Sequence, residues 1–212
     1  MADVRRCDIV ERMDIREFQT GGVDLAERPT RPFAETVSAL SWDLSWDPWD
    51  SIELADGERL TVRQLRGDDV ERLRRLHGRL SPASLRRRFM TACPRPSDAM
   101  LARLVDLDHR DREALVAVAG DEIMAVARYH RRPGTAEAEV AITVADAWQR
   151  RGIARALVRR LVERARENGI DAFVGIISGE NDPARGLLRT LAPGAERRFE
   201  GGEVTFRTSL TA

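Results

Sequence analysis

The period of hydrophobic and polar residues changes several times after residue 60, and each period predicts one kind of element. Alternation over residues 60–65 predicts a strand, and apolar residues three and four positions apart over 70–80 predict a helix. A Ser-Pro pair at 81–82 and a Pro-Ser-Asp run at 96–98 have the residue order of helix starts. This part of the chain is therefore predicted as a strand followed by three helices.

A β-hairpin and a further strand are predicted after residue 110. Two apolar runs at 114–119 and 123–129 flank a Gly-Asp pair, which is the pattern of a hairpin. The third strand, 136–144, alternates with a period of two, so its two glutamates, Glu137 and Glu139, share one face.

The rest of the chain predicts a crossover followed by another helix and two strands. An amphipathic helix over 152–168 precedes an almost unbroken apolar run at 172–177, which is typical of a strand buried on both faces. A helix over 182–191 and strands at 195–199 and 203–209 complete the chain. The fold class is therefore mixed α/β, an antiparallel meander joined to a parallel βαβ crossover.

The loop between the third strand and the long helix, residues 149–154, has the composition of an anion site. Gly152 lacks a Cβ, and two arginines stand beside it. Uncapped N–H groups and the positive end of the helix dipole favour a phosphate at such a helix start. The spacing alone fits an ordinary helix N-terminus with solvated arginines equally well, so the surrounding elements must decide between the two interpretations.

Composition suits one domain of moderate size with a flanking segment. The chain has 212 residues, of which 42% are hydrophobic and 33% charged. Residues 1–50 show no sustained period and are predicted as an N-terminal arm or linker, partly disordered, which leaves 51–212 as the domain. The end of this arm, 41–49, holds three of the four tryptophans and is expected to dock on the domain or on a partner.

Several functional classes are disfavoured by composition. No apolar run is long enough to cross a membrane and the N-terminus lacks an apolar signal core, so a cytoplasmic protein without membrane contact is expected. The cysteines are isolated and the three histidines are scattered, so no metal site is expected. The net charge of zero argues against nucleic-acid binding. All 35 basic residues are arginine, and lysine is absent.

The order of elements around the loop gives it a specific meaning. A strand, a Gln-x-x-Gly-x-Ala loop, a long helix, a buried strand and Glu-Asn-Asp-Pro-Ala at 180–184 together resemble the GNAT superfamily of N-acetyltransferases, over about residues 58–210. The resemblance implies a central, mostly antiparallel mixed sheet flanked by helices, with a V-shaped opening between the fourth and fifth core strands. It also implies acetyl-CoA as the acyl donor, with its pyrophosphate wrapped by Gln149, Arg150, Arg151, Gly152, Ile153 and Ala154.

Two further segments, 80–89 and 138–144, are similar to the acetyltransferase domain of bacterial Pat-type protein lysine acetyltransferases. Proteins of that type usually join this domain to a regulatory part. Residues 1–50 are too short for such a part, so its regulation is not carried over to this chain.

The resemblance also assigns catalytic and binding roles. A lysine ammonium must lose a proton before it can attack a thioester, and Glu139 matches the family's general base. Glu137 is either an alternative base or a like charge that raises the pKa of its neighbour. The family pairs the donor's pantetheine arm with backbone groups that correspond here to Ile142, Thr143 and Val144.

Asn181 matches a family asparagine that contacts the pantetheine arm, although Asn-Asp-Pro at 181–183 is also a good helix cap. The chain departs from the family at 187–189, where many members carry a tyrosine that protonates the leaving thiolate. Here these residues are Leu-Leu-Arg, and Tyr129, the one tyrosine, is expected to be structural.

The sequence therefore predicts an acyltransferase that acetylates a primary amine, with a protein lysine as the leading acceptor. Arg86, Arg87 and Arg88 are expected to help shape the acceptor site. Two alternatives remain open at this stage, a small-molecule amine acceptor and a catalytically idle CoA-binding sensor or interaction protein. The oligomeric state is also open, with a homodimer among the options.

Overall fold

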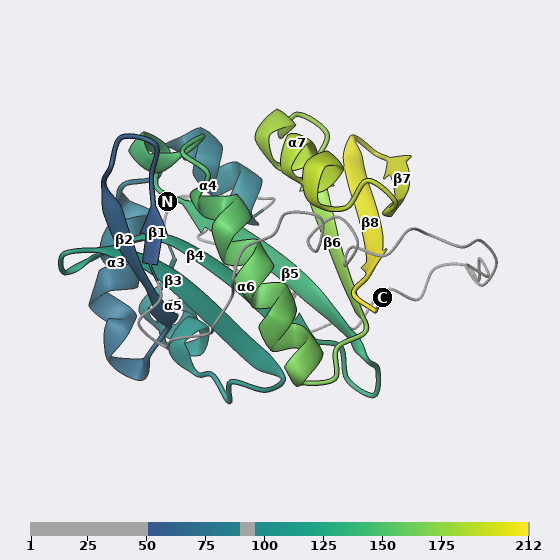
Figure 1. Ribbon diagram of the computed structural model, residues 1–212, viewed down its shortest axis with the longest axis horizontal. Coiled ribbons are helices and arrows are strands. Elements are labelled where there is room, and N and C mark those ends of the chain that lie inside the picture. Colours follow the sequence, from purple (N-terminus) through teal and green to yellow (C-terminus); the bar gives the residue numbers. More distant parts are fainter. Residues whose placement is uncertain (1–50, 90–95, 212) are drawn as a thin grey trace, which may run out of the picture.

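The computed structural model describes residues 51–89 and 96–211. One eight-stranded sheet runs through it in the order β1-β2-β3-β4-β5-β6-β8-β7 (Figure 1). Neighbouring strands are antiparallel except β5 and β6, which are parallel. The strands are β1 (Ser51–Glu53), β2 (Arg59–Gln64), β3 (Arg112–Ala119), β4 (Glu122–Arg131), β5 (Glu137–Val144), β6 (Ala172–Ser178), β7 (Glu196–Glu200) and β8 (Glu203–Ser209).

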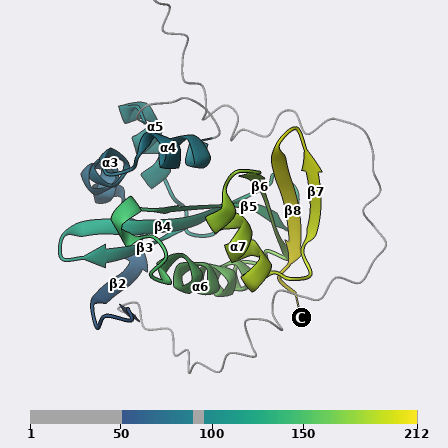
Figure 2. The ribbon, with the colours of Figure 1, turned by 90° about the horizontal axis from the view of Figure 1, so that it is seen from above.

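Helices cover both faces of the sheet. One group of helices lies on one face and a second group on the other, as Figure 2 shows from above. The first group is α3 (Val70–Gly78), α4 (Pro82–Phe89) and α5 (Asp98–Val105), and the second is α6 (Ile153–Glu167) and α7 (Asp182–Leu191). This arrangement confirms the mixed α/β class and the mostly antiparallel sheet that the sequence predicts. The predicted arm at 1–50, with its tryptophan-rich end, lies outside the described residues.

The helices begin where their cap residues predict. The Oγ of Ser97 accepts a hydrogen bond from the N–H of Met100 at the start of α5. Pro82 is the first residue of α4, directly after Ser81. Such caps satisfy N–H groups that have no partner inside the helix, which is why local sequence locates these ends well.

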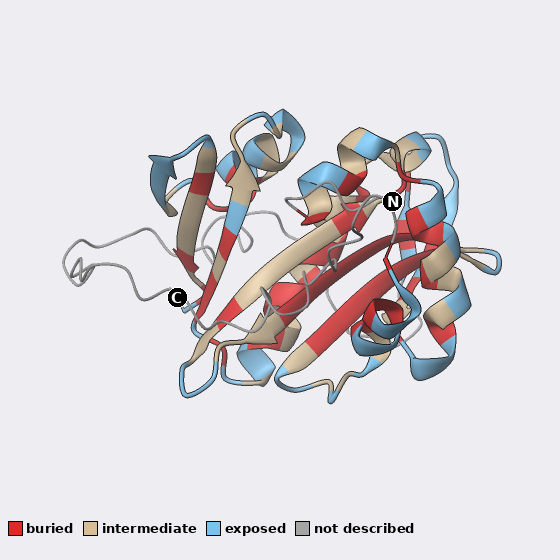
Figure 3. Cartoon of the chain, turned by 180° about the vertical axis from the view of Figure 1, so that it is seen from behind, coloured by how far each residue is buried: buried red, intermediate tan, exposed pale blue. Residues whose placement is uncertain are grey.

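The core consists of one apolar layer on each side of the sheet. One layer packs α6 against the sheet through residues such as Leu157 and Leu161, and the other packs α3 and α5 through Leu73 and Leu101. The two central strands, β3 and β4, are buried along most of their length (Figure 3). No helix in the described part of the chain is long and apolar enough to cross a membrane.

The sheet opens between β5 and β6. These strands pair only from Glu137 with Ala172 to Glu139 with Val174, whereas β5 stays paired with β4 through Val144. The opening therefore lies between the fourth and fifth core strands, counted from β2, as the resemblance implies.

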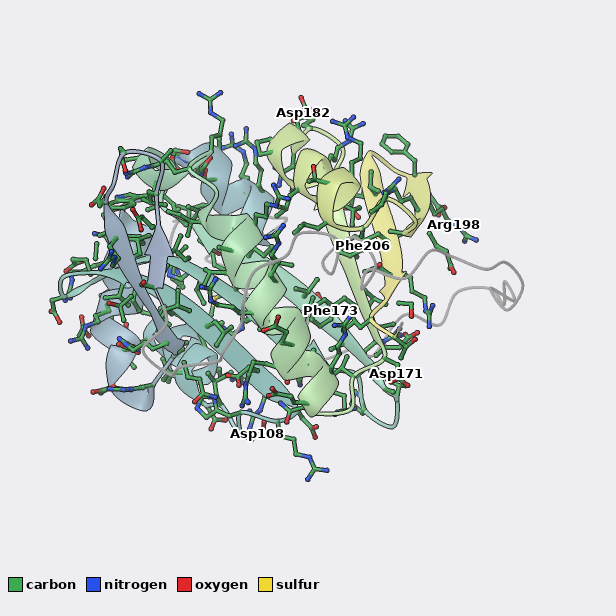
Figure 4. All side chains as sticks on the ribbon, viewed as in Figure 1. Asp108, Asp171, Phe173, Asp182, Arg198 and Phe206 are labelled. Carbon is green, nitrogen blue, oxygen red and sulfur yellow. The ribbon has the colours of Figure 1, made fainter. Side chains whose placement is uncertain are left out.

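The strand β6 corrects one prediction. Its apolar run is not buried on both faces throughout, because Ile176 is 41% exposed. This residue lies beyond the last pairing with β5, at the edge of the opening. Nearer the start of the strand, Phe173 lies beside α6 (Figure 4) and belongs to the same apolar core, with its ring 6.0 Å from that of Tyr129.

Candidate active site

The strand β5 presents free backbone groups to the opening. The N–H of Ala145 donates to Met124 O, and the N–H of Arg132 donates to Glu137 O. In an antiparallel pair the backbone groups alternate in direction, so odd-numbered residues of β5 bond β4 and even-numbered residues point away from it. Because β6 has diverged by then, the N–H groups of Ile142 and Val144 face the opening without a strand partner in the described structure.

Thr143 is placed differently from its two neighbours. Its backbone groups face β4, so they cannot pair with a ligand in the opening. Its side chain is 6% exposed, and the Oγ1 atom has no hydrogen-bond partner among the described residues. A buried hydroxyl without a partner is uncommon in native proteins.

Glu139 lies at the point where β5 and β6 part. It is half-buried, and its side chain is on the sheet face covered by α4, the face opposite to that of Ala138 and α6. Burial raises the pKa of Glu139 above the ordinary glutamate value, although the nearby charges of Arg88 and Arg132 oppose that change. A carboxylate in such surroundings takes up a proton more readily than one in water.

Glu137 shares that face but is held by two ion pairs. Its carboxylate accepts hydrogen bonds from Arg132 Nη1 at 3.1 Å and from Arg207 Nε at 2.7 Å. The Arg207 contact joins β5 to β8, which lies on the other side of β6. Glu137 therefore has a structural function that Glu139 does not have.

The loop 149–154 leads into α6 through a left-handed residue. Gly152 is the N-cap residue and has φ = 86°, a conformation that glycine adopts without steric cost. Arg150, two residues earlier, also has a positive φ of 61°. No side chain caps the first turn of α6, so the N–H groups of Ile153 and Ala154 are not satisfied by a cap.

Two side chains of this loop already have partners. Gln149 Nε2 donates to Val144 O at 3.2 Å and to Asp146 Oδ1 at 3.0 Å, which folds the side chain back onto the end of β5. Arg151 forms ion pairs with Asp56 and Glu58 of the β1–β2 turn. Its guanidinium also lies 4.5 Å from the centre of the Trp148 ring. Arg150, in contrast, is exposed.

Asn181 is the N-cap of α7. Its Oδ1 atom accepts a hydrogen bond from the N–H of Ala184 at 3.3 Å, so the capping interpretation of this residue is confirmed. A contact from its remaining amide N–H₂ group to a ligand is compatible with the cap.

Tyr129 is structural, as expected. It is 1% exposed, and its hydroxyl donates to Arg110 O at 2.9 Å and accepts from Asn168 Nδ2 at 2.8 Å. This network lies near the end of α6 that is remote from Gly152. The hydroxyl is therefore committed to the fold.

The structure brings together residues that the sequence motifs did not single out. The carboxylate of Asp146 accepts a hydrogen bond from the N–H of Ser81, and so ties the N-terminus of α4 to the loop before α6. Arg128, on β4, is 8% exposed and pairs across the strands with Ala141. The sequence signal for Arg128 is an arginine inside the predicted apolar strand 123–129, because charged residues are rarely buried without a partner.

Comparisons with known proteins agree with this geometry. The model of the acetyltransferase (GNAT) family matches residues 81–192, more than half of the chain. An acetyltransferase of Pseudomonas aeruginosa is 33% identical over 142 residues, which are 65% of this chain and 76% of the relative. The acetyltransferase Pat of Mycolicibacterium smegmatis is 31% identical over 143 residues, which are 66% of this chain but only 43% of that relative.

A solved structure shows the same fold. The crystal structure of the GNAT domain of S. lividans PAT superposes with a TM-score of 0.70 at 32% sequence identity. The match covers 76% of this chain and 96% of that domain. Family model, relatives and fold agree, and the chain is an acyltransferase that belongs to the GNAT family.

Proposed function

We propose that this protein transfers an acetyl group from acetyl-CoA to the side-chain amine of a protein lysine. One juxtaposition supports the proposal most strongly. Along β5 and the loop that follows it, the half-buried Glu139, the free backbone edge at Ile142 and Val144, and the uncapped start of α6 succeed one another beside a single opening. A proton acceptor for the amine, a backbone edge for the pantetheine arm and an anion site for the pyrophosphate therefore follow one another along the chain. This is also their order along acetyl-CoA, from the reacting thioester to the phosphates.

The residues present fit acetyl-CoA. The uncapped N–H groups of the first turn of α6 and the helix dipole suit a pyrophosphate, with Arg150 as the exposed cation beside it. Arg151 would contribute through its backbone, since its guanidinium is engaged with Asp56 and Glu58. The N–H groups of Ile142 and Val144 suit the amide carbonyl groups of a pantetheine arm laid beside β5 as an added strand.

Acetyl-CoA supplies the acetyl group as an activated thioester, and the protein supplies the proton acceptor. Almost every lysine amine is protonated at neutral pH, with an ordinary pKa of about 10.4. Glu139, whose pKa is raised by burial, accepts that proton directly or through water. No tyrosine lies at 187–189 to protonate the thiolate. A thiol pKa of about 8.5 makes the thiolate a tolerable leaving group without one.

The acceptor is inferred from two observations. Both the M. smegmatis relative and the S. lividans domain carry the name Pat, and the S. lividans domain matches over almost its whole length. In addition, the charges that act on Glu139 come from arginines rather than from acidic residues. A polycationic small amine would be repelled there, which argues against that class of small-molecule acceptor.

Acetylation of purified proteins and peptides in the presence of acetyl-CoA tests the proposal. Because the chain contains no lysine, every acetyl-lysine found by mass spectrometry belongs to the acceptor. We expect lysine acetylation by the wild type and a large loss with Glu139→Gln, while acetyl-CoA binding remains. Acetylation of small amines alone would contradict the lysine assignment, and acetyl-CoA binding without turnover on any amine would identify a sensor.

A comparison of acetyl-lysine profiles extends the test to cells. Cells that contain the wild type, the Glu139→Gln variant or no protein are compared. Lysine sites that gain acetylation only with the wild type identify the acceptor. Identical profiles in all three would contradict protein lysine as the substrate.

A further inference from the structure

Positive charge exceeds negative charge around Glu139. The side chains of Glu139 and Arg128 lie on the same face of the sheet, because Glu139 pairs with His130 and Arg128 is two residues along β4. Arg88 approaches the same face from α4, and its charge acts on Glu139. Two guanidinium groups and one carboxylate therefore occupy a largely buried region.

Arg128 has no carboxylate partner in the described structure. Its Nη2 atom donates to the backbone oxygen of Leu104 at 3.0 Å, and the side chain is 8% exposed. Burial, together with the charges of Arg88 and Arg112, lowers the pKa of Arg128 to about 9. A carbonyl oxygen satisfies one N–H group but does not neutralise the charge, so this arginine remains a net cation.

Arg88 also forms no direct ion pair with any of the described residues. Its guanidinium lies 5.1 Å from the centre of the Phe89 ring, and Glu139 is the carboxylate whose charge favours its ionised form. Burial lowers the pKa of Arg88. The residue as a whole is intermediate between buried and exposed.

The neighbouring titratable groups do not balance these charges. Arg112 is paired with Asp106 and Asp108, and Arg132 with Glu137. His77 stacks on Phe89, and burial lowers its pKa to about 4, so it is neutral at pH 7.

His130 does not balance the two arginines either. His130 lies opposite Glu139, and burial lowers its pKa too. The carboxylate of Glu137 on the same face is already paired with Arg132 and Arg207. When Glu139 accepts a proton, Arg88 and Arg128 therefore have no unpaired carboxylate beside them, a state that is costly in a buried site.

We propose that Arg88 and Arg128 form an anion subsite for a carboxylate of the acceptor, so that the preferred acceptor is a lysine with an aspartate or glutamate within two positions. Arg88 contacts the carboxylate directly, and the buried Arg128 on β4 attracts it through its charge without direct contact. The inference rests on the proposed function, since the carboxylate belongs to the molecule that brings the amine to Glu139. An acidic neighbour offsets the surplus charge when Glu139 takes up its proton.

Acetylation of matched peptides by the wild type tests the subsite without any mutation. Peptides differ only in carrying Glu, the isosteric neutral Gln, or Arg beside the lysine. We expect kcat/KM to be about ten times higher for Glu than for Gln, because hydrogen bonds to charged groups exceed neutral ones by about that factor. The Arg peptide should be poorest, and equal values for Glu and Gln would overturn the inference.

Two variants assign the preference to a residue. Arg88→Met keeps the length of the side chain but removes its charge, and should make the Glu and Gln peptides nearly equivalent. Arg103→Met removes the charge of an exposed arginine on α5 and should leave the preference intact. A preference for the Glu peptide that survives Arg88→Met would contradict the assignment. Arg88→Lys keeps the charge and should retain the preference, which shows that a loss in Arg88→Met reflects charge rather than folding.

A binding measurement separates the subsite from the proposed function. Glutarate presents carboxylates without an amine, and its binding is measured by calorimetry with wild type, Arg88→Met and Arg103→Met. The subsite is supported if Arg88→Met abolishes glutarate binding and Arg103→Met does not. That result would stand even if no lysine peptide were acetylated, in which case the proposed function alone would be refuted. Lysine acetylation without glutarate binding and without an acidic preference would refute the subsite alone.

Discussion

Ser81 and Asp146 are joined by a hydrogen bond of 2.9 Å from the backbone N–H of Ser81 to the carboxylate of Asp146. Ser81 precedes α4, which carries Arg88, whereas Asp146 lies between β5 and the loop that leads into α6. The other carboxylate oxygen of Asp146 accepts from Gln149 in that loop. One carboxylate thus connects the helix proposed for the acceptor with the loop proposed for acetyl-CoA.

Replacement of Asp146 by alanine should disturb both substrates together. Burial opposes ionisation of Asp146, but hydrogen bonds from Ser81 and Ser84 outweigh it and lower its pKa. Loss of these bonds should cost about 2 kcal/mol of unfolding free energy and raise KM for acetyl-CoA and for the acceptor. Asp98→Ala, which removes an exposed ion pair with Arg74, should cost less than about 1 kcal/mol and leave both KM values unchanged.

The two glutamates of β5 should respond differently to substitution. Glu139→Gln removes the proposed proton acceptor, and we expect kcat/KM at neutral pH to fall about 100-fold or more. Because burial raises the pKa of Glu139, wild-type activity should be lost as the pH falls through a value above the ordinary glutamate pKa. That acidic limb of the pH–rate profile should be absent in Glu139→Gln.

Glu137→Gln is the matched control for that prediction. It breaks ion pairs with Arg132 and Arg207, so thermal stability should fall while the acidic limb of the pH profile remains. Loss of the limb in Glu137→Gln but not in Glu139→Gln would reverse the assignment of the base.

Gly152→Ala should weaken acetyl-CoA binding beyond its effect on stability. An alanine at φ = 86° costs about 1–2 kcal/mol, and relaxation of the loop would displace the N–H groups of the first turn of α6. Gly169→Ala imposes a similar strain at the opposite end of the same helix, where φ is 71°, and a Cβ meets no atom within 4 Å at either position. Calorimetry should show reduced acetyl-CoA affinity for Gly152→Ala alone, although both variants lose stability.

His77 should make the protein acid-sensitive. Its Nδ1 atom lies 2.8 Å from Leu73 O, and burial lowers its pKa to about 4 from an ordinary value near 6.5. Between these values the unfolded chain binds a proton that the folded chain does not, so stability decreases as the pH falls from about 6.5 to about 4. The full loss is of the order of 3 kcal/mol.

Urea unfolding of His77→Leu at several pH values checks this prediction. The variant should lose less stability than the wild type between pH 7 and pH 4.5. An identical pH dependence in both proteins would show that other groups cause the acid sensitivity.

Local chemistry explains which elements the sequence could predict. Ser97 and the Ser-Pro pair at 81–82 mark helix starts through contacts within a few residues, so those predictions were correct. The short strand β1 was missed because three residues, Ser51–Glu53, carry no period, and their pairing with β2 defines the strand. The exposure of Ile176 was missed because it depends on where β6 leaves β5, which is a matter of pairing rather than of local sequence.

The same limit applies to the candidate site. The spacing of the loop located Gly152 and the helix start, since both lie within one short segment. It could not show that Arg151 is engaged by Asp56 and Glu58, which lie more than 90 positions earlier in the chain. Arg128 was missed for a related reason, because its lack of a carboxylate partner becomes evident only when α4, α5 and β4 are packed together.

The short pairing between β5 and β6 also determines how the sheet can deform. Three residue pairs join the five strands from β1 to β5 to the three strands from β6 to β7, whereas the β3–β4 ladder has eight pairs. Within the sheet, the two sets of strands are therefore joined by backbone pairing at one end of β5 and β6 only, while the apolar core beneath α6 packs against both sets. We expect a widening of the gap to load those three pairs and the shared core before any other ladder, so a long molecule would leave by a hinge movement of the two sets of strands rather than by local unfolding.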